Sequence, residues 1–348
     1  SHLSEGGIAI QWLQTYEISD PLLYTMVAAL VEQFPHVNAY TTNGGDLLFA
    51  VSAAPIPPLD MGRLAHEHLV PELARVGLDS EADFRVRYLG DRDMLVALVS
   101  LYGAKPHSDY HPSVALNAPR SRFVGDSVVS LVTLARAGMP VLEFTSGKRP
   151  ASLQDNVAFI ASGVGARDHW QARWVRDALT DPGSALPVAM DPGLAEHVAR
   201  LRRLSEAGVP AESLDDWLES VAVVADFSVG FLPAADHAGV WQAPSWIDPA
   251  MQPEEVLAVL DAYESAATRD PARMVASSRR ALALLDTSRP AAVREQLLVL
   301  AMLGEIARGD LEAAEETERS LGPGVPAGRT YGFVRAYLLA WIDTQRGG

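Results

Sequence analysis

Histidine and carboxylate side chains, which are common metal ligands, occur close together at two places in the chain. His66 and His68 flank Glu67, and His107 and His111 lie four residues apart. On a helix, residues two apart point in different directions, so the first pair cannot share an ion there. Prolines beside both histidines of the second pair exclude a helix, and with it the geometry for a shared ion. The sequence therefore predicts solvated polar surface at both places and no metal site.

Glycine-rich segments and tryptophans could serve a nucleotide or an aromatic ligand. Ser146-Gly147-Lys148 lacks the upstream glycine and the trailing serine or threonine of a phosphate loop, and Gly163-Val164-Gly165 follows no clear strand. We therefore expect turns there. Five tryptophans are better explained by packing in the core or between domains than by ligand stacking. They are Trp170, Trp174, Trp217, Trp241 and Trp246.

Composition limits the classes of function further. The 348-residue chain has a hydrophobic fraction of 48%, no cysteine and a formal net charge of −16. Disulfides and thiolate chemistry are excluded, and the surplus of acid argues against nucleic-acid binding, which needs clustered lysine and arginine. No apolar run approaches the roughly 18 to 20 residues of a membrane span, so we expect no signal peptide, no membrane helix and a cytoplasmic location.

The N-terminal part of the chain has the pattern of strand, helix and hairpin. A Gly-Gly turn leads into an apolar strand from Ile8, and a helix begins near Ser19-Asp20-Pro21, where serine or aspartate can cap and proline is tolerated. Asn43-Gly44, a strong hairpin signal, then separates a second strand from a third over Leu47 to Ser52. This order is typical of the last elements of a doubly wound α/β domain.

The rest of the chain is predicted to be helical, apart from a turn-rich segment over residues 105–122. Arg308-Gly309-Asp310 joins two of the helices, and the small residues Ala301, Gly304 and Ala314 allow close helix contact. This pair resembles a tetratricopeptide-type hairpin, although an array normally needs at least three such repeats. The expected helices are 60–76, in which Pro71 is a candidate point of interruption, and 92–102, 126–137, 167–180, 192–206, 213–224, 253–268, 271–286, 290–308, 310–320 and 329–345.

Four segments share their order and spacing with one family. They are Gly6 to Tyr16, Phe34 to Val37, Gly45 to Ala50, and Ser108 to Arg120. The first three resemble the closing third of the spermidine synthase (polyamine aminopropyltransferase) domain. The fourth is similar to the segment that follows this domain in bacterial members fused behind membrane helices. The resemblance covers residues 5–122, about a third of the chain.

The resemblance implies a class I methyltransferase-like fold, which binds decarboxylated S-adenosylmethionine and transfers its aminopropyl group to an amine such as putrescine. In the family, a Gly-rich turn and an acidic ribose ligand hold the nucleotide, and two aspartates on a loop hold the amine and provide the base. No segment of this sequence matches those elements. The resemblance therefore implies no catalytic residue and no cofactor for this chain alone, and we expect it to be inactive by itself.

Two residues match, or adjoin, peripheral positions of the family's amine site. Gln11 matches a glutamine that lines the amine side, although a polar strand-end residue that satisfies backbone groups is the simpler interpretation. A family tyrosine aligns with Thr41, beside Tyr40, and Tyr40 is better explained by packing on a neighbouring strand. The residues of the fourth segment whose role the sequence does not reveal are Ser108, Asp109 and Pro112.

These observations predict three regions. Residues 1–122 are the C-terminal part of a spermidine synthase-like domain, residues 123–245 are helical, and residues 246–348 form a helical-hairpin, tetratricopeptide-like domain. The fold class is thus α/β followed by all-α. The leading hypothesis is the C-terminal portion of an aminopropyltransferase of polyamine biosynthesis. The alternative is a non-enzymatic helical interaction scaffold that retains a methyltransferase-fold remnant.

The first strand also predicts a partner, since bare apolar strands aggregate. The missing N-terminal half of the synthase domain, or a separate chain that supplies its strands, would cover this edge. The helical region would bind a protein partner, and a homo-oligomer stays open. The resemblance implies that this portion faces the cytoplasm, as the soluble part of an inner-membrane protein if the parent is fused to membrane helices.

Overall fold

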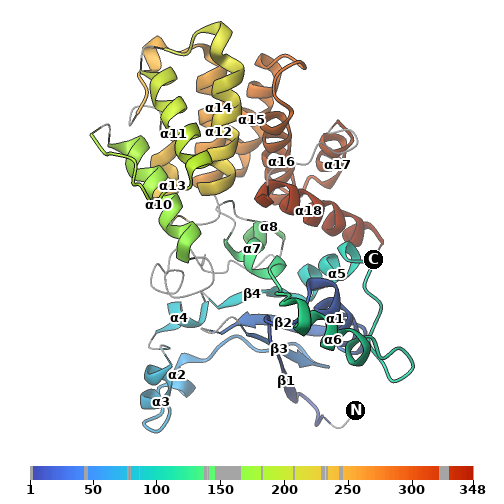
Figure 1. The fold of residues 1–348 in the computed structure, drawn as a ribbon. Coiled ribbons are helices and arrows are strands. Elements are labelled where there is room, and N and C mark those ends of the chain that lie inside the picture. Colours follow the sequence, from blue (N-terminus) through green and yellow to red (C-terminus); the bar gives the residue numbers. More distant parts are fainter. Residues whose placement is uncertain are drawn as a thin grey trace.

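Figure 1 shows the computed structural model of the chain, with a small four-strand antiparallel sheet and helices at the N-terminus, followed by a mainly helical region. Helices account for 64% of the structure. The residues that the structure describes are 3–42, 46–76, 78, 80–85, 87–136, 139, 141–145, 166–181, 183–206, 208–228, 232, 234–242, 246–320 and 329–347.

The sheet has four strands, and one helix connects the first strand to the second. They are β1 (Ile8–Leu13), α1 (Asp20–Gln33), β2 (His36–Thr41), β3 (Leu47–Ser52) and β4 (Tyr88–Asp91). The strand order is β1-β3-β2-β4, and every neighbouring pair is antiparallel. β1 and β2 therefore run in the same direction on either side of β3, connected through α1. The expected order of strand, helix and two strands is confirmed, whereas the turn at Asn43-Gly44 lies outside the described residues.

The two faces of the sheet differ in burial. Ala39 and Phe49 lie on the inner face, which α1 and α5 (Arg92–Leu101) help to cover, and both are fully buried. On β1 the opposite face carries Ile8, Ile10 and Trp12, which are 42%, 60% and 48% exposed. Successive side chains of a strand point to opposite faces, so these three form one apolar stripe. We call Ile8, Ile10 and Trp12 the β1 stripe.

The helix expected over residues 60–76 is wrong as a single element. The structure has two short helices there, α2 (Met61–Leu64) and α3 (Val70–Arg75), and neither buries any residue. Pro71 lies in the first turn of α3, where a backbone N–H would have no acceptor within the helix, so its absence has no cost. In the interior of one long helix the same proline would remove a hydrogen bond, so a helix from upstream does not continue through it. His66 and His68 lie between these two helices, whereas the helix expected over residues 60–76 would have included both of them.

The turn-rich segment 105–122 contains most of a helix that the local sequence pattern does not predict. α6 (Ser113–Val124) begins directly after Pro112 and holds Pro119 in its interior. Proline in a helix interior removes a hydrogen bond and is a strong signal against helix, but packing of α6 on α1 outweighs it here. The sequence also did not predict four short elements, because a short segment repeats its apolar spacing too few times to be recognised. They are α4 (Glu81–Arg85), β4, α8 (Val141–Thr145) and α13 (Ala234–Trp241).

The remaining helices agree closely with the sequence-based expectation. They are α7 (Ser130–Arg136), α10 (Ala166–Thr180), α11 (Pro192–Ser205), α12 (Leu214–Ser228), α14 (Glu254–Ala267), α15 (Pro271–Leu284), α16 (Ala291–Ala307), α17 (Leu311–Ser320) and α18 (Arg329–Gly347), with single 3₁₀ turns η2 (Ala211–Ser213) and η4 (Pro249–Met251). Within the described ranges, no helix combines the length and apolar character that crossing a membrane requires.

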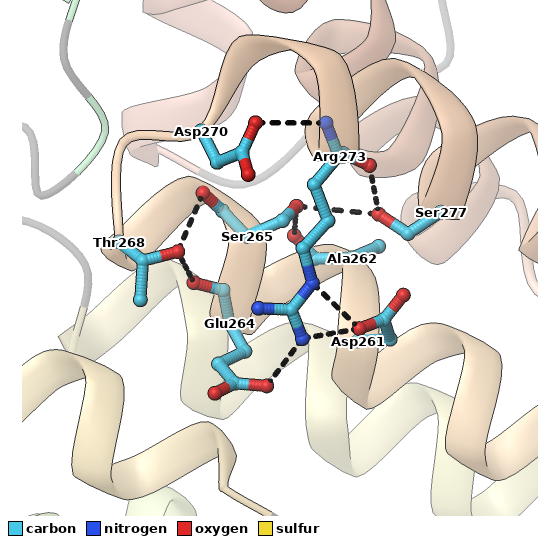
Figure 2. Close-up of polar contacts among 8 residues, drawn as sticks. All are labelled: Asp261, Ala262, Glu264, Ser265, Thr268, Asp270, Arg273 and Ser277. Carbon is cyan, nitrogen blue, oxygen red and sulfur yellow. Dashed lines mark hydrogen bonds and ion pairs between the residues drawn. The ribbon is translucent and has the colours of Figure 1, made fainter.

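A polar network fixes the α14–α15 hairpin, as Figure 2 shows. The Arg273 guanidinium of α15 reaches back to α14, where Nε donates to Asp261 Oδ1 at 3.0 Å and Nη2 donates to Glu264 Oε2 at 2.6 Å. Asp270 caps α15 by accepting from the Arg273 amide at 3.0 Å, and the Ser265 and Ser277 hydroxyls lie 3.2 Å apart. These contacts set the angle between the two helices.

Close approach between α15 and α16 depends on a glycine. A Cβ at Gly304 would lie 2.8 Å from the Pro271 carbonyl oxygen and 2.9 Å from Val275 Cγ2. Ala301 and Ala314 are also buried in this part of the molecule. The expected role of a small residue in helix contact is therefore confirmed at Gly304.

The C-terminal helix joins the two parts of the molecule. α18 packs against α5 beside the sheet, as well as against α7, α12, α16 and α17 of the helical part (Figure 1). Its Tyr337 hydroxyl lies 2.9 Å from Thr145 Oγ1 of α8. One hydrophobic core consequently runs from the sheet through the helices.

Glu305 of α16 makes stability depend on pH. Its side chain is 3% exposed and pairs with Arg279 at 2.6 Å, and burial raises the pKa of Glu305 above its ordinary value of 4.5. The folded chain therefore takes up this proton at higher pH than the unfolded chain, and the stability it contributes is lost as pH rises through the folded pKa.

We expect Glu305→Gln to remove this dependence. Urea unfolding at about pH 4 and about pH 7 should show the wild type losing stability relative to the variant as pH rises. Glu312→Gln, at an exposed carboxylate of α17, should show no such trend. A wild type that gains stability relative to Glu305→Gln on going to pH 7 would contradict the argument.

Candidate functional site at the carboxyl end of β1

Gln11 and Tyr40 do not form a common site. Gln11 of β1 is opposite Phe49 of β3, which is opposite Ala39 of β2, so these three side chains share one face of the sheet. Tyr40 follows Ala39 and lies on the other face. The two residues that the family resemblance suggested are therefore on opposite sides of the sheet.

Each of these two residues makes a structural contact. The Gln11 amide is exposed and its Nε2 donates to the Trp12 carbonyl at 2.8 Å. Tyr40 is half-buried and meets the Tyr88 ring edge-on, with centroids 5.4 Å apart, and burial raises the pKa of Tyr40. These are the contacts that the simpler interpretation predicts, a backbone-satisfying amide and a packed strand tyrosine.

The Ser108–Pro112 motif forms a turn that places α6. Ser108 and His111 exchange backbone hydrogen bonds of 3.2 and 3.0 Å, and the Ser108 hydroxyl also accepts from the His111 amide at 3.2 Å. Asp109 is exposed at the corner of this turn, and Pro112 is the residue before α6.

His107 anchors this turn to the sheet domain. Its amide donates to the Thr25 carbonyl of α1 at 2.8 Å, and its Nδ1 accepts from the Val114 amide of α6 at 3.4 Å. The motif therefore connects α6 to α1. It has no contact with Gln11 or Tyr40 among the interactions of the described residues.

The structure instead brings together three residues that the sequence did not connect. Asp20, in the first turn of α1, accepts hydrogen bonds from the Ser130 amide at 3.2 Å, from the Val129 amide at 3.3 Å and from the Ser130 hydroxyl. The Ser130 proton is directed to Asp20, so the Tyr24 hydroxyl, 2.6 Å from Ser130 Oγ, is the donor in that pair. We call Asp20, Tyr24 and Ser130 the α1–α7 cluster.

Aromatic packing completes the cluster. Tyr24 is fully buried and stacks on Tyr102 with ring centroids 4.7 Å apart. Burial raises the pKa of Tyr24 well above its ordinary value and that of Tyr102 to about 12, so both remain neutral hydroxyls. Ser130 is 2% exposed, so its hydroxyl is enclosed by the protein. The cluster therefore holds α7 against the sheet domain.

This cluster also corrects the expected helix cap. Ser19 stands at the N-cap of α1 but makes no side-chain cap hydrogen bond. Asp20, the other candidate, directs its carboxylate across to Val129 and Ser130. The sequence signal Ser19-Asp20-Pro21 predicted where the helix begins, but not what the carboxylate binds, since its partner is 110 residues away.

The cluster lies at the carboxyl end of β1, where doubly wound folds bind ligands. Here the chain itself covers that end. Ser127 bridges Tyr16, and the Val128 amide donates to the Thr15 carbonyl at 2.7 Å. Glu17, in the left-handed region with φ of 58°, pairs with Arg122 at 3.2 Å. The loop after β1 is thus occupied by structural contacts.

Among the residues that the structure describes, no three histidine, aspartate or glutamate side chains are grouped closely enough to hold an ion. The His66 and His68 rings lie 5.3 Å apart, and His68 approaches Glu67 at 3.6 Å. The two glycine-rich segments, Ser146-Gly147-Lys148 and Gly163-Val164-Gly165, lie outside the described residues.

The tryptophans are mainly core residues, as expected. Trp217 donates to the Ser205 hydroxyl at 3.1 Å, and Trp241 donates to His237 Nε2 at 2.9 Å. Burial, with Arg269 nearby, lowers the pKa of His237 to about 3, which keeps it a neutral acceptor. Trp174 and Trp246 are partly buried against the core. Trp170 differs: it is 46% exposed, with the Arg173 guanidinium 5.0 Å from its ring centroid.

Comparison of the chain with protein-family models, with curated proteins and with solved structures found no match. A function for this chain must consequently be inferred from its sequence, its fold and the contacts of the described residues.

Proposed function

We propose that the chain is the C-terminal portion of a spermidine synthase-like aminopropyltransferase, a protein of polyamine biosynthesis that uses decarboxylated S-adenosylmethionine. One observation carries this proposal: β1 and β2 run parallel, joined by α1, with β3 antiparallel between them. Parallel strands joined by a helix are the unit of α/β sheets. A strand, a helix and a hairpin are also what the family resemblance implies for the end of a methyltransferase-like domain.

On this proposal the chain provides the last strands and helix of the domain, but none of the residues that bind the nucleotide or catalyse the transfer. The loop after β1, Gln14 to Ser19, contains no glycine, and its one carboxylate, Glu17, is paired with Arg122. Gln11 and Tyr40 cannot hold one amine between them from opposite faces of the sheet. The nucleotide and the amine would bind the preceding part of the parent domain, whose strands, or those of a separate chain, would pair with the free edge of β1.

The helical region then extends the synthase-like part. α18 and α6 pack directly on α5 and α1, so the helices and the sheet share one core. We infer that this region is a tetratricopeptide-like module that docks a protein partner of the parent enzyme on the cytoplasmic side. Its acidic character favours a cationic partner surface.

Calorimetric titration with decarboxylated S-adenosylmethionine tests the proposal. We expect no saturable heat with this chain, and binding in the range of about 1 μM to 1 mM once the polypeptide encoded in frame upstream is joined to it. Intact mass of each sample excludes co-purified chains. Saturable binding to this chain alone would show a nucleotide site within it. If the longer polypeptide is folded and shows no saturable heat with decarboxylated S-adenosylmethionine, the synthase proposal is refuted.

The α14–α17 helices favour a second candidate function, a non-enzymatic interaction scaffold. The α14–α15 and α15–α16 contacts are tight, through the Arg273 network and the close approach at Gly304, and hairpins stacked this way commonly present a surface to a partner. The DNA just upstream separates the two functions. A Gly-rich turn and paired aspartates in frame would favour the enzyme, whereas a start codon near Leu3 would favour the scaffold.

A further inference from the structure

β1 ends the sheet with a free edge. Within the described part of the chain it pairs with β3 alone. The only other pairing nearby, Ser127–Val128 with Thr15–Tyr16, begins beyond Leu13. In Figure 1, β1 is the strand farthest from the helical region, and none of the labelled helices of that region lies beside it. Backbone N–H and C=O groups along this edge are available to another strand.

The charge distribution favours a second copy of the same strand. The chain carries a formal net charge of −16, yet Ile8–Leu13 contains no charged residue. Along the sequence, the nearest acidic residues are Glu5 and Glu17, which lie beyond the two ends of β1, and Asp46 directly precedes Leu47 of the neighbouring strand, the partner of Leu13 at one end of β1. Two such acidic molecules can approach each other most closely along a neutral apolar strand, because repulsion is weakest there.

We propose that two copies of this chain pair antiparallel along β1, about a two-fold axis at Ile10. Directly opposed residues of an antiparallel pair share a face of the sheet. Centring the pair on Ile10 sets Ile10 against Ile10 and Ile8 against Trp12, so every member of the β1 stripe meets an apolar partner. The pairing joins two four-strand sheets into one continuous sheet.

The register is the distinctive part of this proposal. Moving the axis by one residue toward the N-terminus sets Trp12 against Gly6, and moving it the other way sets Ile8 against Gln14. At the proposed register Glu5 is opposite Thr15, and Glu17 is opposite Leu3, so no acidic residue faces its own copy. The proposal concerns this chain by itself and does not rest on the proposed enzyme function, under which strands of the preceding part of the parent domain take the same edge of β1 in place of a second copy.

Single cysteines test the register, since the chain has none of its own. In an Ile10→Cys variant the two cysteines would face each other with Cα atoms about 4.5–5.5 Å apart, within disulfide range. Mild oxidation should therefore convert most of the variant to a covalent dimer that reductant reverses. Ile8→Cys is the matched control, because the two copies of residue 8 would lie about 13 Å apart along the strand.

A mass measurement tests the dimer itself. Sedimentation of the wild type should give twice the 37.4 kDa chain mass. Ile10→Lys should give the monomer mass with unchanged far-ultraviolet circular dichroism, whereas Phe123→Lys, at an apolar residue of α6 that is 90% exposed, should stay dimeric. A monomeric wild type would overturn the proposal, as would Ile8→Cys cross-linking as readily as Ile10→Cys.

Discussion

Replacing Asp20 by alanine is expected to lower the free energy of unfolding by about 3 kcal/mol, because buried donors that lose their only acceptor cost about 1–3 kcal/mol each. The buried donors are the Ser130 amide and the Ser130 hydroxyl, and the part-buried Val129 amide loses the same acceptor. Urea unfolding measures the loss. Hydrogen exchange of the Val129 and Ser130 amides should also quicken, since the Asp20 carboxylate accepts a hydrogen bond from each of them.

Two variants separate this role from a general effect of removing charge. Asp20→Asn keeps one acceptor oxygen and should lose less stability than Asp20→Ala. Asp109→Ala removes an exposed carboxylate and should change the free energy of unfolding by less than about 0.5 kcal/mol. Equal effects of Asp20→Ala and Asp109→Ala would show that the cluster does not stabilise the fold.

Arg335→Met is expected to cost about 3–5 kcal/mol, because it leaves a carboxylate buried without its counter-charge. Arg335 of α18 pairs with Glu295 of α16 at 2.6 Å, and their side chains are 13% and 6% exposed. The double variant Glu295→Leu/Arg335→Met removes both charges, so it should regain most of the stability. Urea unfolding of the two variants and the wild type measures both changes.

The exposed pair of Arg280 and Glu254 provides the control. Their nitrogen–oxygen distance is 2.8 Å, close to that of the buried pair, but the side chains are 58% and 59% exposed. Arg280→Met should therefore cost at most about 1 kcal/mol. If Arg335→Met is no more harmful than Arg280→Met, the junction between α16 and α18 does not depend on this ion pair.

Local patterns in the sequence were sufficient to predict most of the elements. Helical spacing of apolar residues predicted α10 through α18 except α13, because long amphipathic helices repeat their signal over several turns. The β1–α1–β2–β3 order followed from capping residues, prolines and apolar strands. α6 was missed because Pro112 and Pro119 signal a break, and its packing on α1 overrides that local signal.

The candidate site was less accessible to sequence reasoning. Gln11 and Tyr40 were matched one at a time to a family pattern, but the face of a strand residue depends on its register with β3, which only the folded sheet defines. The contact of Asp20 with Ser130 joins residues 110 positions apart. No spacing rule covers such a pair, because it depends on how the chain returns to α1.

By itself, the sequence determined most of the elements and the exclusions: where the long helices begin, which strands are apolar, the absence of cysteine and the large negative charge. These are properties of short segments and of composition, and elementary chemistry is enough to infer them. The open edge of the first strand was already expected from the sequence, but only the tertiary structure decided that Ile8, Ile10 and Trp12 form one exposed stripe there, that Asp20 connects α1 to α7, and that α18 joins the helices to the sheet. Those features depend on contacts between distant segments, and the chain acquires them when it folds.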